Sequence, residues 1–545
     1  MFTESMSNEA FASKDFFIYA EADCKGESSV RLVHSKASCH WRLSKSISTD
    51  ENVPQYFHCL DLLTNIAPVS RDGILQVEDG SITDGSSPRA TGTALEHLVQ
   101  TCYKIRGIPA QQGLCVVTKL ILVTRSGYLC RNDILELRMR HSEFIESVIP
   151  LSAAGGYIPL VEPLGETHLL ALFTSSPGAL LVDEKPTTPS HEMVKSLDQD
   201  LQARPSFDWV LQTKPQARKV AMVGGRAMYD PKKMSFCSQG ALEAAQALGI
   251  SVVVVDKPGH WLQDETYSCL QDEFVAIDTT IDEGLPSRIA EAVRDMGIDG
   301  ITTFTDDFLD ATVRAAEKLS LSTEPTLAYA QSLNKYVTRK LASPNAQALR
   351  LDNAGGGSRG VSKVLFFELS DEFPCLADAE DATVSDNFAE DIGVYPSRLE
   401  PEERDLVRPP LYRTILQLGF RSGVFHVEAR VQNLTMRYKT TNGIVDLDYV
   451  TADSATPLSI LRTYDVDFSS LQWLQAIDDT ERFAALCHPF TYSSQYCSAD
   501  VNIPIHRRNI HVPKVYYDEM LGSQRSPHTF LKQNVLLQRR PCRRR

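Results

Sequence analysis

The sequence predicts an α/β fold, because short apolar strands alternate with helical segments in the middle of the chain. Three segments have the length and apolar character of buried strands, namely Lys219 to Val223, Ser251 to Val255 and Ile301 to Phe304. Apolar residues recur at helical spacing between and after them. Strands that alternate with helices build parallel sheets with right-handed crossovers. Residues 215–330 are therefore predicted to form one Rossmann-like unit.

The helices expected in this unit have recognisable ends. Ala241 to Leu248 repeats apolar residues at helical spacing, and Gly249 follows as the terminating glycine. Ser287 is expected to cap a second helix that ends at Gly297. A third helix is expected over residues 306–319.

The glycines after the first strand do not match a dinucleotide-binding loop. Gly224-Gly225-Arg226 lacks the G-x-G-x-x-G spacing, and the chain has no P-loop lysine pattern. A nicotinamide-dependent oxidoreductase is therefore disfavoured.

The first part of the chain carries little functional signal. Residues 1–205 are predicted to form an N-terminal α/β domain of unclear role, with strands at Val116 to Thr124 and Leu169 to Phe173. Residues 521–545 are predicted to be a basic tail.

Composition excludes several classes of protein. The 545 residues suffice for about three to four domains. The 55 basic and 70 acidic residues give a formal net charge of −15, which disfavours nucleic acid or an anionic membrane as a partner. The first residues do not resemble a secretory signal, and no apolar run is long enough to span a bilayer, so a cytoplasmic protein is expected. The twelve cysteines include no C-x-x-C pair and are expected to be mostly reduced.

A glycine-rich segment is the most informative part of the sequence. Its residues are Gly355, Gly356, Gly357, Ser358, Arg359, Gly360 and Val361. The glycines let several backbone N–H groups point at one anion, and Arg359 and Lys363 add positive charge. Such a loop can cover the phosphates of ATP, whereas a flexible linker is the alternative. The apolar residues that follow, Val364 to Phe366, predict an immediate strand and favour the phosphate loop.

A second segment, Phe425 to Val431, alternates as a strand does. Period-2 alternation puts His426, Glu428 and Arg430 on one face. A carboxylate between two cationic groups suits a Mg²⁺ or phosphate site, and an exposed sheet face with cross-strand ion pairs is the alternative. A turn at Asn442-Gly443 predicts a hairpin, whose return strand adds Asp446 and Asp448 as further carboxylates or as solvated residues.

A third segment, Ser332 to Lys340, places Lys335 at a junction between two helical stretches. This residue is either a phosphate-binding lysine or an ordinary surface lysine.

Taken in order, these segments resemble the ATP-grasp superfamily, specifically fungal carboxylate–amine ligases similar to carnosine synthase. The resemblance covers residues 215–515. It rests on an N-K-Y-x-x-R helix start, a G-G-S-R-G-V loop and an F-H-x-E strand, which are residues 334–339, 356–361 and 425–428.

The resemblance implies an ATP-grasp fold over residues 331–520, preceded by a Rossmann-like pre-ATP-grasp domain. It implies an enzyme that phosphorylates a carboxylate with ATP and joins the acyl phosphate to an amine, with Mg²⁺ or Mn²⁺ as the metal. Lys335 would contact phosphate, residues 355–361 with Lys363 would cover the phosphates, and Glu428 would bind the metal. Arg430, on the same strand face, would clamp the substrate carboxylate. The substrates would be amino-acid-like small molecules of secondary metabolism. Because related ligases are often dimers, the resemblance allows a homodimer.

Three departures from the family pattern indicate missing internal segments. Ala342 to Ala354 is short and has no second ATP-binding lysine. The loop runs directly into Leu365 to Asp371, without an adenine-binding hinge, and Asp453 to Thr456 stands where an E-x-N-x-R motif is expected. The ATP-grasp domain is therefore expected to be abbreviated. The alternative function is a non-catalytic, ATP-grasp-like nucleotide-binding protein.

Overall fold

The computed structural model of the chain divides into two compact units. Residues 1–217, 247–249 and 488–493 form the N-terminal unit, and residues 218–246, 250–487 and 494–545 form the C-terminal unit. The structure describes residues 12–21, 31–44, 55–66, 76–79, 94–108, 113–152, 156–161, 169–183, 190–226, 239–333, 337–338, 341, 362–366, 376–377, 392–395, 401–429, 461, 464–491 and 498–501.

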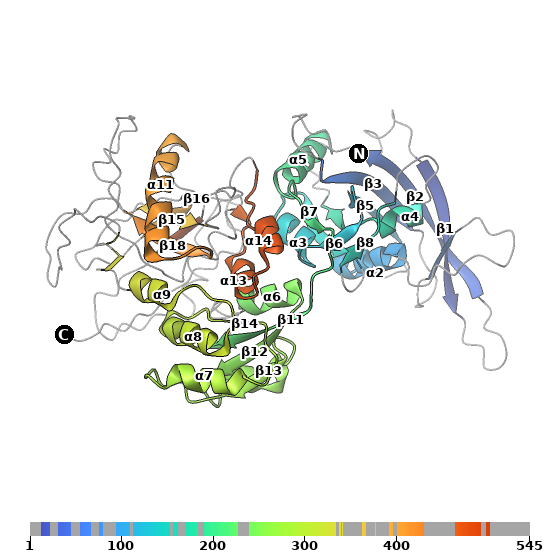
Figure 1. The fold of residues 1–545 in the computed structure, drawn as a ribbon. Coiled ribbons are helices and arrows are strands. Elements are labelled where there is room, and N and C mark those ends of the chain that lie inside the picture. The colour runs from blue at the N-terminus through green and yellow to red at the C-terminus, as the bar shows by residue number, and fades with distance from the viewer. Residues whose placement is uncertain are drawn as a thin grey trace, which may run out of the picture. The chain divides into compact units, whose positions relative to one another are not determined.

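The N-terminal unit is built on a seven-stranded sheet in the order β4-β1-β2-β3-β5-β9-β7, in which all neighbouring strands are antiparallel (Figure 1). The strands are β1 (Ala12–Glu21), β2 (Arg31–Ser44), β3 (Phe57–Ile66), β4 (Gln76–Asp79), β5 (Leu114–Val123), β7 (Ile145–Pro150) and β9 (Gly178–Val182). A smaller sheet contains β6 (Gly127–Leu129), β8 (Tyr157–Ile158) and β10 (Val210–Leu211). The helices are α2 (Ala94–Arg106), α3 (Ile134–Met139), α4 (Leu169–Thr174) and α5 (Ser190–Ala203).

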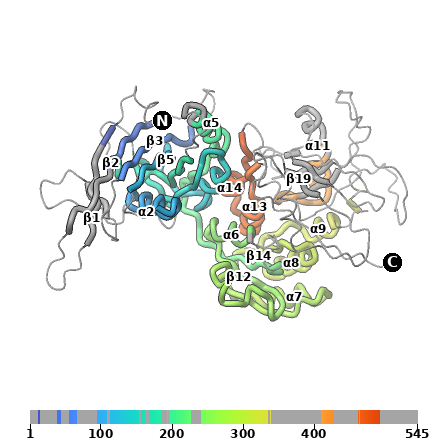
Figure 2. Tube along the Cα trace, turned by 180° about the vertical axis from the view of Figure 1, so that it is seen from behind, coloured from blue at the N-terminus to red at the C-terminus, as the bar shows by residue number. Residues whose placement is uncertain are grey.

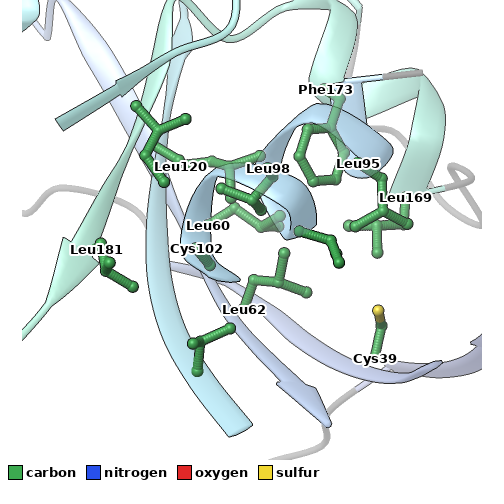
Figure 3. Packing of buried hydrophobic residues seen from close by; sticks show 14 of the residues in the cluster. Cys39, Leu60, Leu62, Leu95, Leu98, Cys102, Leu120, Leu169, Phe173 and Leu181 are labelled. Carbon is green, nitrogen blue, oxygen red and sulfur yellow. The ribbon is translucent and has the colours of Figure 1, made fainter. Parts of the chain in front are cut away.

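The main core of this unit lies where α2 and α4 pack on the sheet. Figure 3 shows Leu95 and Leu98 of α2 beside Leu60 and Leu62 of β3, and all four side chains are buried. Successive side chains of a strand point to opposite faces of the sheet, so the residues between these apolar ones lie on the other face.

Two strand predictions in this unit had different outcomes. The strand predicted at Val116 to Thr124 is confirmed as β5. The strand predicted at Leu169 to Phe173 is wrong, because these residues form α4. Leu169, Leu172 and Phe173 are all buried at helical spacing, whereas a short continuous apolar run has no periodicity that separates strand from helix.

The other face of the sheet carries a charge ladder of Arg42, Asp61, Lys119 and Asp198. The register places Arg42 opposite Asp61 and Asp61 opposite Lys119 on the adjacent strands β2, β3 and β5. Lys119 Nζ lies 2.6 Å from Asp61 Oδ1 and 3.3 Å from Asp198 Oδ1 of α5, and Arg42 donates to Asp61 Oδ2 at 3.1 Å. Burial is the largest single effect on the pKa of Lys119 and lowers it, but the charges of Asp61, Cys59 and Asp198 and the hydrogen bond to Asp61 together outweigh burial, so the net pKa shift is upward. The lysine therefore stays charged inside the unit.

The C-terminal unit begins with a four-stranded parallel sheet in the order β13-β12-β11-β14. Its strands are β11 (Arg218–Val223), β12 (Ile250–Asp256), β13 (Glu273–Ala276) and β14 (Gly300–Thr302). The three predicted strands are confirmed as β11, β12 and β14. The edge strand β13 was not predicted, because its half-exposed sequence lacks the apolar run of a buried parallel strand.

Helices cover this sheet. They are α6 (Gln239–Leu248), α7 (Leu285–Val293) and α8 (Asp306–Leu319), with short 3₁₀ turns η2 (Trp261–Gln263) and η3 (Glu265–Tyr267), whereas α9 (Thr326–Ser332) packs against α8. α7 and α8 share a core with Ala221 and Val253, whereas α6 lies on the opposite face (Figure 1). All three predicted helices are present, but the predicted cap Ser287 is wrong. Gly284 holds the N-cap position and Pro286 lies in the first turn, where its missing N–H costs nothing.

Two helices from late in the sequence complete this unit, α13 (Phe468–Ala476) and α14 (Thr480–Leu486). α13 runs beside α6 and β14 (Figure 2). Trp473, which is fully buried, donates from Nε1 to the Ala241 carbonyl at 2.7 Å. A Cβ atom at Gly300 would overlap the backbone carbonyl of Ala476, so the close approach of α13 to β14 requires glycine there.

We expect Gly300→Ala to destabilise the C-terminal unit by about 1–3 kcal/mol, because α13 or β14 must move to admit the methyl group. Urea unfolding of the full chain, followed by hydrogen exchange in β14 and α13, measures this loss. Gly240→Ala is the matched control, since a Cβ atom at Gly240 meets open space, and no loss is expected there. Equal behaviour of the two variants would contradict the proposed close contact.

The rest of the C-terminal unit contains two small antiparallel sheets and one long helix. The sheets are β16-β15-β18 and β17-β19, formed by β15 (Ser362–Phe366), β16 (Leu376–Ala377), β17 (Ile392–Tyr395), β18 (Phe425–Ala429) and β19 (Ser498–Val501), and the helix is α11 (Pro401–Leu418). None of the described helices has the length and apolar character needed to cross a membrane. Among the described residues, none of the seven cysteines is in a disulfide.

Candidate functional site

Two of the predicted site segments form neighbouring strands. The strands predicted after the glycine-rich segment and at Phe425 are confirmed as β15 and β18, and they pair antiparallel. The register places Lys363 opposite Glu428 and Leu365 opposite His426. Residues directly opposite each other in an antiparallel pair lie on the same side of the sheet. Two predicted site residues that are 65 positions apart in the sequence are thus register partners.

Other predicted site residues lie outside the described part of the chain. These are Lys335, Arg430, and the loop residues Gly355, Gly356, Gly357, Ser358, Arg359, Gly360 and Val361. The hairpin turn at Asn442-Gly443, with Asp446 and Asp448, also lies outside it. Within the described residues, no group of three or more His, Cys, Asp or Glu side chains is arranged to hold a metal.

The start of β18 is anchored to the segment before α9. The backbone N–H groups of Arg421 and Ser422 donate to the carboxylate of Glu324 at 3.0 and 2.9 Å, and the Ser422 hydroxyl donates to it at 2.7 Å. A carboxylate that accepts several hydrogen bonds fixes a turn firmly, because charge-assisted hydrogen bonds are the strong ones. These hydrogen bonds therefore fix the position of the backbone just before β18, the strand that carries Glu428.

Aromatic packing reinforces this anchor. The ring centroids of Phe420 and Phe425 lie 4.7 Å apart, and Tyr329 of α9 meets Phe420 edge-on at 5.1 Å. Burial raises the pKa of Tyr329 to about 12, with a further contribution from the charge of Glu324. The tyrosine is therefore neutral at physiological pH.

The segment around Lys335 is helical on both sides, as predicted. α9 ends at Ser332, residues 337–338 are helical, and the Thr338 hydroxyl donates to the Gln331 carbonyl at 2.8 Å. This hydrogen bond ties the two helical stretches together across the position of Lys335.

A third set of residues, which the sequence motifs did not identify, lies at the carboxyl end of β11. Gly224 is in a left-handed conformation with φ of 81°, and the Gly225 N–H donates to Asp256 Oδ2 at 2.7 Å. A Cβ atom at Gly225 would overlap the ring of His260. The loop lacks the dinucleotide fingerprint, so no sequence motif identifies it. The signal in the sequence is Asp256, an acidic residue directly after an apolar run.

Comparison with known proteins connects this unit to one group of enzymes. Residues 242–323 match the family model described as the ATP-grasp N-terminal domain. The curated protein "ATP-grasp enzyme fsqD" of Aspergillus fumigatus is 28% identical to this chain over 492 residues, covering 72% of this chain and 84% of the relative.

Similar solved structures include an L-amino acid ligase from Bacillus licheniformis, with a TM-score of 0.40, 16% identity and coverage of 53% of this chain and 81% of that one. Phosphoribosylglycinamide synthetase from Anaerococcus prevotii gives a TM-score of 0.35 at 14% identity, covering 48% of this chain and 76% of that one. The chain is thus similar in residues 242–323 to the ATP-grasp N-terminal domain, and over most of its length to one curated ATP-grasp enzyme.

Proposed function

We propose that the protein is an ATP-dependent ligase that joins the carboxylate of an amino-acid-like substrate to an amine through an acyl phosphate. The pairing of β15 with β18 is the observation that carries this proposal. β15 follows the glycine-rich segment directly, and its first residue, Ser362, pairs with the last residue of β18, Ala429. The glycine-rich segment therefore enters the strand pair at the end where β18 leaves towards Arg430.

In this proposal the positively charged groups bind the phosphates and the substrate carboxylate, and the negatively charged group binds the metal. Lys335, Lys363 and the backbone N–H groups of residues 355–361 hold the phosphates of ATP. Glu428 supplies a hard carboxylate oxygen, which fits Mg²⁺, and Arg430 clamps the substrate carboxylate as a fork. ATP and Mg²⁺ would supply the phosphoryl group and the neutralising charge. The protein's own contribution is positioning and electrostatic stabilisation, which account for most of the catalysis of phosphoryl transfer.

We also propose that residues 331–520 are an abbreviated ATP-grasp domain, next to a pre-ATP-grasp domain over residues 215–330. The alignment with the fungal relative runs over 492 positions, whereas 72% of 545 residues is about 392. About 100 aligned positions thus have no counterpart in this chain, which supports missing internal segments. Residues 1–205 remain a separate N-terminal domain in this proposal, and a cytoplasmic homodimer acting in secondary metabolism is compatible with it.

The alternative is a nucleotide-binding protein without turnover. The absence of a second lysine in Ala342 to Ala354 favours this alternative.

Product analysis separates the two functions. The purified chain is incubated with ATP, Mg²⁺ and pairs of L-amino acids, and nucleotides are resolved by chromatography. We expect ADP and phosphate to be released only when both a carboxylate and an amine are present. Release of AMP and pyrophosphate would contradict the acyl-phosphate route. ATP binding without turnover would support the alternative, and would show that the abbreviated domain has lost its activity.

A further inference from the structure

The turn that precedes β18 begins and ends with a glycine. Gly419 has a φ of 101° and Gly423 a φ of 136°, both in the region that residues with a side chain rarely adopt. Glycine restricts the backbone least of all residues, so the local sequence does not fix the direction in which the chain leaves this turn. Contacts from other parts of the chain therefore set the direction of β18.

The half-buried carboxylate of Glu324 supplies contacts of this kind. One of its oxygens, Oε2, accepts from the Arg421 N–H, and the other, Oε1, accepts from both the N–H and the hydroxyl of Ser422. Both oxygens are thus engaged by the turn, in hydrogen bonds that the negative charge strengthens. The turn before β18 is therefore tied to the segment before α9.

A helix from later in the chain holds the same turn. Gln475 of α13 donates from Nε2 to the Ser422 hydroxyl at 2.8 Å. The direction of both hydrogen bonds of this hydroxyl is determined, because an amide nitrogen only donates and a carboxylate only accepts. The hydroxyl accepts from Gln475 and donates to Glu324. A network in which donors and acceptors match in this way specifies one arrangement of its members.

The helix α13 is in turn hydrogen-bonded to the parallel sheet. Gln472, one turn before Gln475, donates to the Thr303 carbonyl and, at 3.3 Å, to the Thr302 hydroxyl. The Thr303 hydroxyl donates to the carbonyl of Val223, the last residue of β11, at 2.7 Å. The turn before β18 is thus connected through α13 to the carboxyl ends of two strands of the sheet.

We propose that Glu324 and Gln475 are positioning residues for Glu428. They act through Ser422, whose place fixes the point from which the chain runs into β18. This inference rests on the proposed role of Glu428 at the metal. Glu428 follows Ser422 by six residues, which span about 20 Å when extended, so a change of about 5° in direction would move it by about 2 Å. A misplacement of about 1 Å is enough to impair a preorganised site strongly.

Calorimetric titration of the full chain with ATP tests the proposal without requiring turnover. The dissociation constant of ATP is measured in EDTA and in excess Mg²⁺, and the ratio of the two constants gives the tightening of ATP binding by Mg²⁺. We expect Glu324→Gln to reduce this tightening about tenfold, the smaller of the usual effects of residues that orient a metal ligand. Glutamine keeps the length of the side chain but replaces one acceptor oxygen with an N–H₂ donor. Binding of ATP in EDTA is expected to stay the same.

The matched control is Glu291→Gln, which removes the same charge from an exposed position on α7. We expect this control to leave both dissociation constants unchanged. If Glu324→Gln behaves like the control, Glu324 has no positioning role.

Hydrogen exchange measures the anchor directly. In Glu324→Gln we expect the amides of Arg421 and Ser422 to exchange about tenfold faster, the effect of losing one hydrogen bond of ordinary net strength. Amides of β12 should exchange as in the unmodified chain. Unchanged exchange at Arg421 and Ser422 would contradict the hydrogen bonds from which the proposal is argued.

Two further positions separate the contribution of α13. Ser422→Ala removes the hydroxyl that joins Glu324 to Gln475 but keeps the backbone N–H, so it should reduce the Mg²⁺ tightening less than Glu324→Gln does. Ser422→Thr keeps the hydroxyl and should restore the tightening. Gln475→Met removes the donor while favouring the helix, and should match Ser422→Ala. Full tightening in both Ser422→Ala and Gln475→Met would remove Gln475 from the positioning role.

A double variant decides whether Glu324 acts through Glu428. In a Glu428→Gln background, Glu324→Gln should cause no further loss of Mg²⁺ tightening, because the group that it positions is gone. An equal loss in both backgrounds would overturn the proposal. Equal weakening of ATP binding in EDTA and in Mg²⁺ would also overturn it, since Glu324 would then have a purely structural role.

The result is separable from that of the ligase proposal. If Glu324→Gln reduces the Mg²⁺ tightening in a chain that forms no ligated product, the positioning role stands and the ligase function fails. If the chain forms product and Glu324→Gln keeps the full tightening, the ligase function stands and the positioning role fails. ATP binding that Mg²⁺ does not tighten in the unmodified chain would overturn both the metal role of Glu428 and its positioning by Glu324.

Discussion

Replacing Glu428 with glutamine is expected to reduce Mg²⁺-dependent ADP release by about 10²–10³-fold, the usual cost of removing one electrostatic group from a preorganised site. Glutamine keeps the size of the side chain and the backbone register opposite Lys363, but it removes the negative charge that a hard cation requires. The measurement is steady-state ADP release as a function of Mg²⁺ concentration, together with the thermal unfolding midpoint.

The matched control for this variant is Glu291→Gln, which removes the same charge from an exposed position on α7. We expect the control to keep full activity and both variants to keep the thermal midpoint of the unmodified chain. If Glu428→Gln releases ADP as fast as the control, Glu428 has no part in the proposed mechanism.

Asp61→Ala is expected to destabilise the N-terminal unit by about 3–5 kcal/mol, the typical cost of breaking a buried ion pair from one side. Lys119 is only 5% exposed, so without Asp61 its charge keeps a single carboxylate partner, the half-exposed Asp198. Arg42 loses the same partner. Hydrogen exchange of amides in β3 and β5 during urea unfolding measures the stability of the N-terminal unit separately from that of the C-terminal unit.

A double replacement is the control for this prediction. Asp61→Leu combined with Lys119→Met removes both buried charges and keeps apolar volume, and such exchanges are often neutral or stabilising. We expect the double variant to unfold at a higher urea concentration than Asp61→Ala. If Asp61→Ala costs less than about 1 kcal/mol, the ladder behaves like an exposed ion pair and its buried geometry is contradicted.

The parallel sheet of the C-terminal unit could be predicted from sequence because its strands are buried on both faces. Val252 to Val255 is a continuous apolar run with a glycine just before the strand, and β11 has the same character. The N-terminal sheet was mostly missed. β1 and β2 mix polar and charged residues with apolar ones, and their pairing depends on register rather than on any local pattern.

Only those features of the candidate site that lie within one short segment could be predicted from the sequence. The F-H-x-E alternation marked β18 as a strand, but its pairing with a strand that begins 63 positions earlier in the sequence is a tertiary contact. The interaction of His260 with Arg226 likewise joins residues 34 positions apart, and no spacing rule links a histidine to a backbone carbonyl. The roles of Lys335 and of the glycine-rich segment stay predictions.

The close packing of α13 against β14 and α6 has a consequence for how the chain folds during synthesis. The strands of the parallel sheet are complete at residue 302, but Trp473 and the other buried residues of α13 are made about 170 residues later. At about 5–20 residues per second, the ribosome leaves this surface uncovered for about 10–30 seconds. A nascent chain that stalls before residue 476 would present the uncovered apolar surface to chaperones, so quality control can distinguish an unfinished product from a finished one.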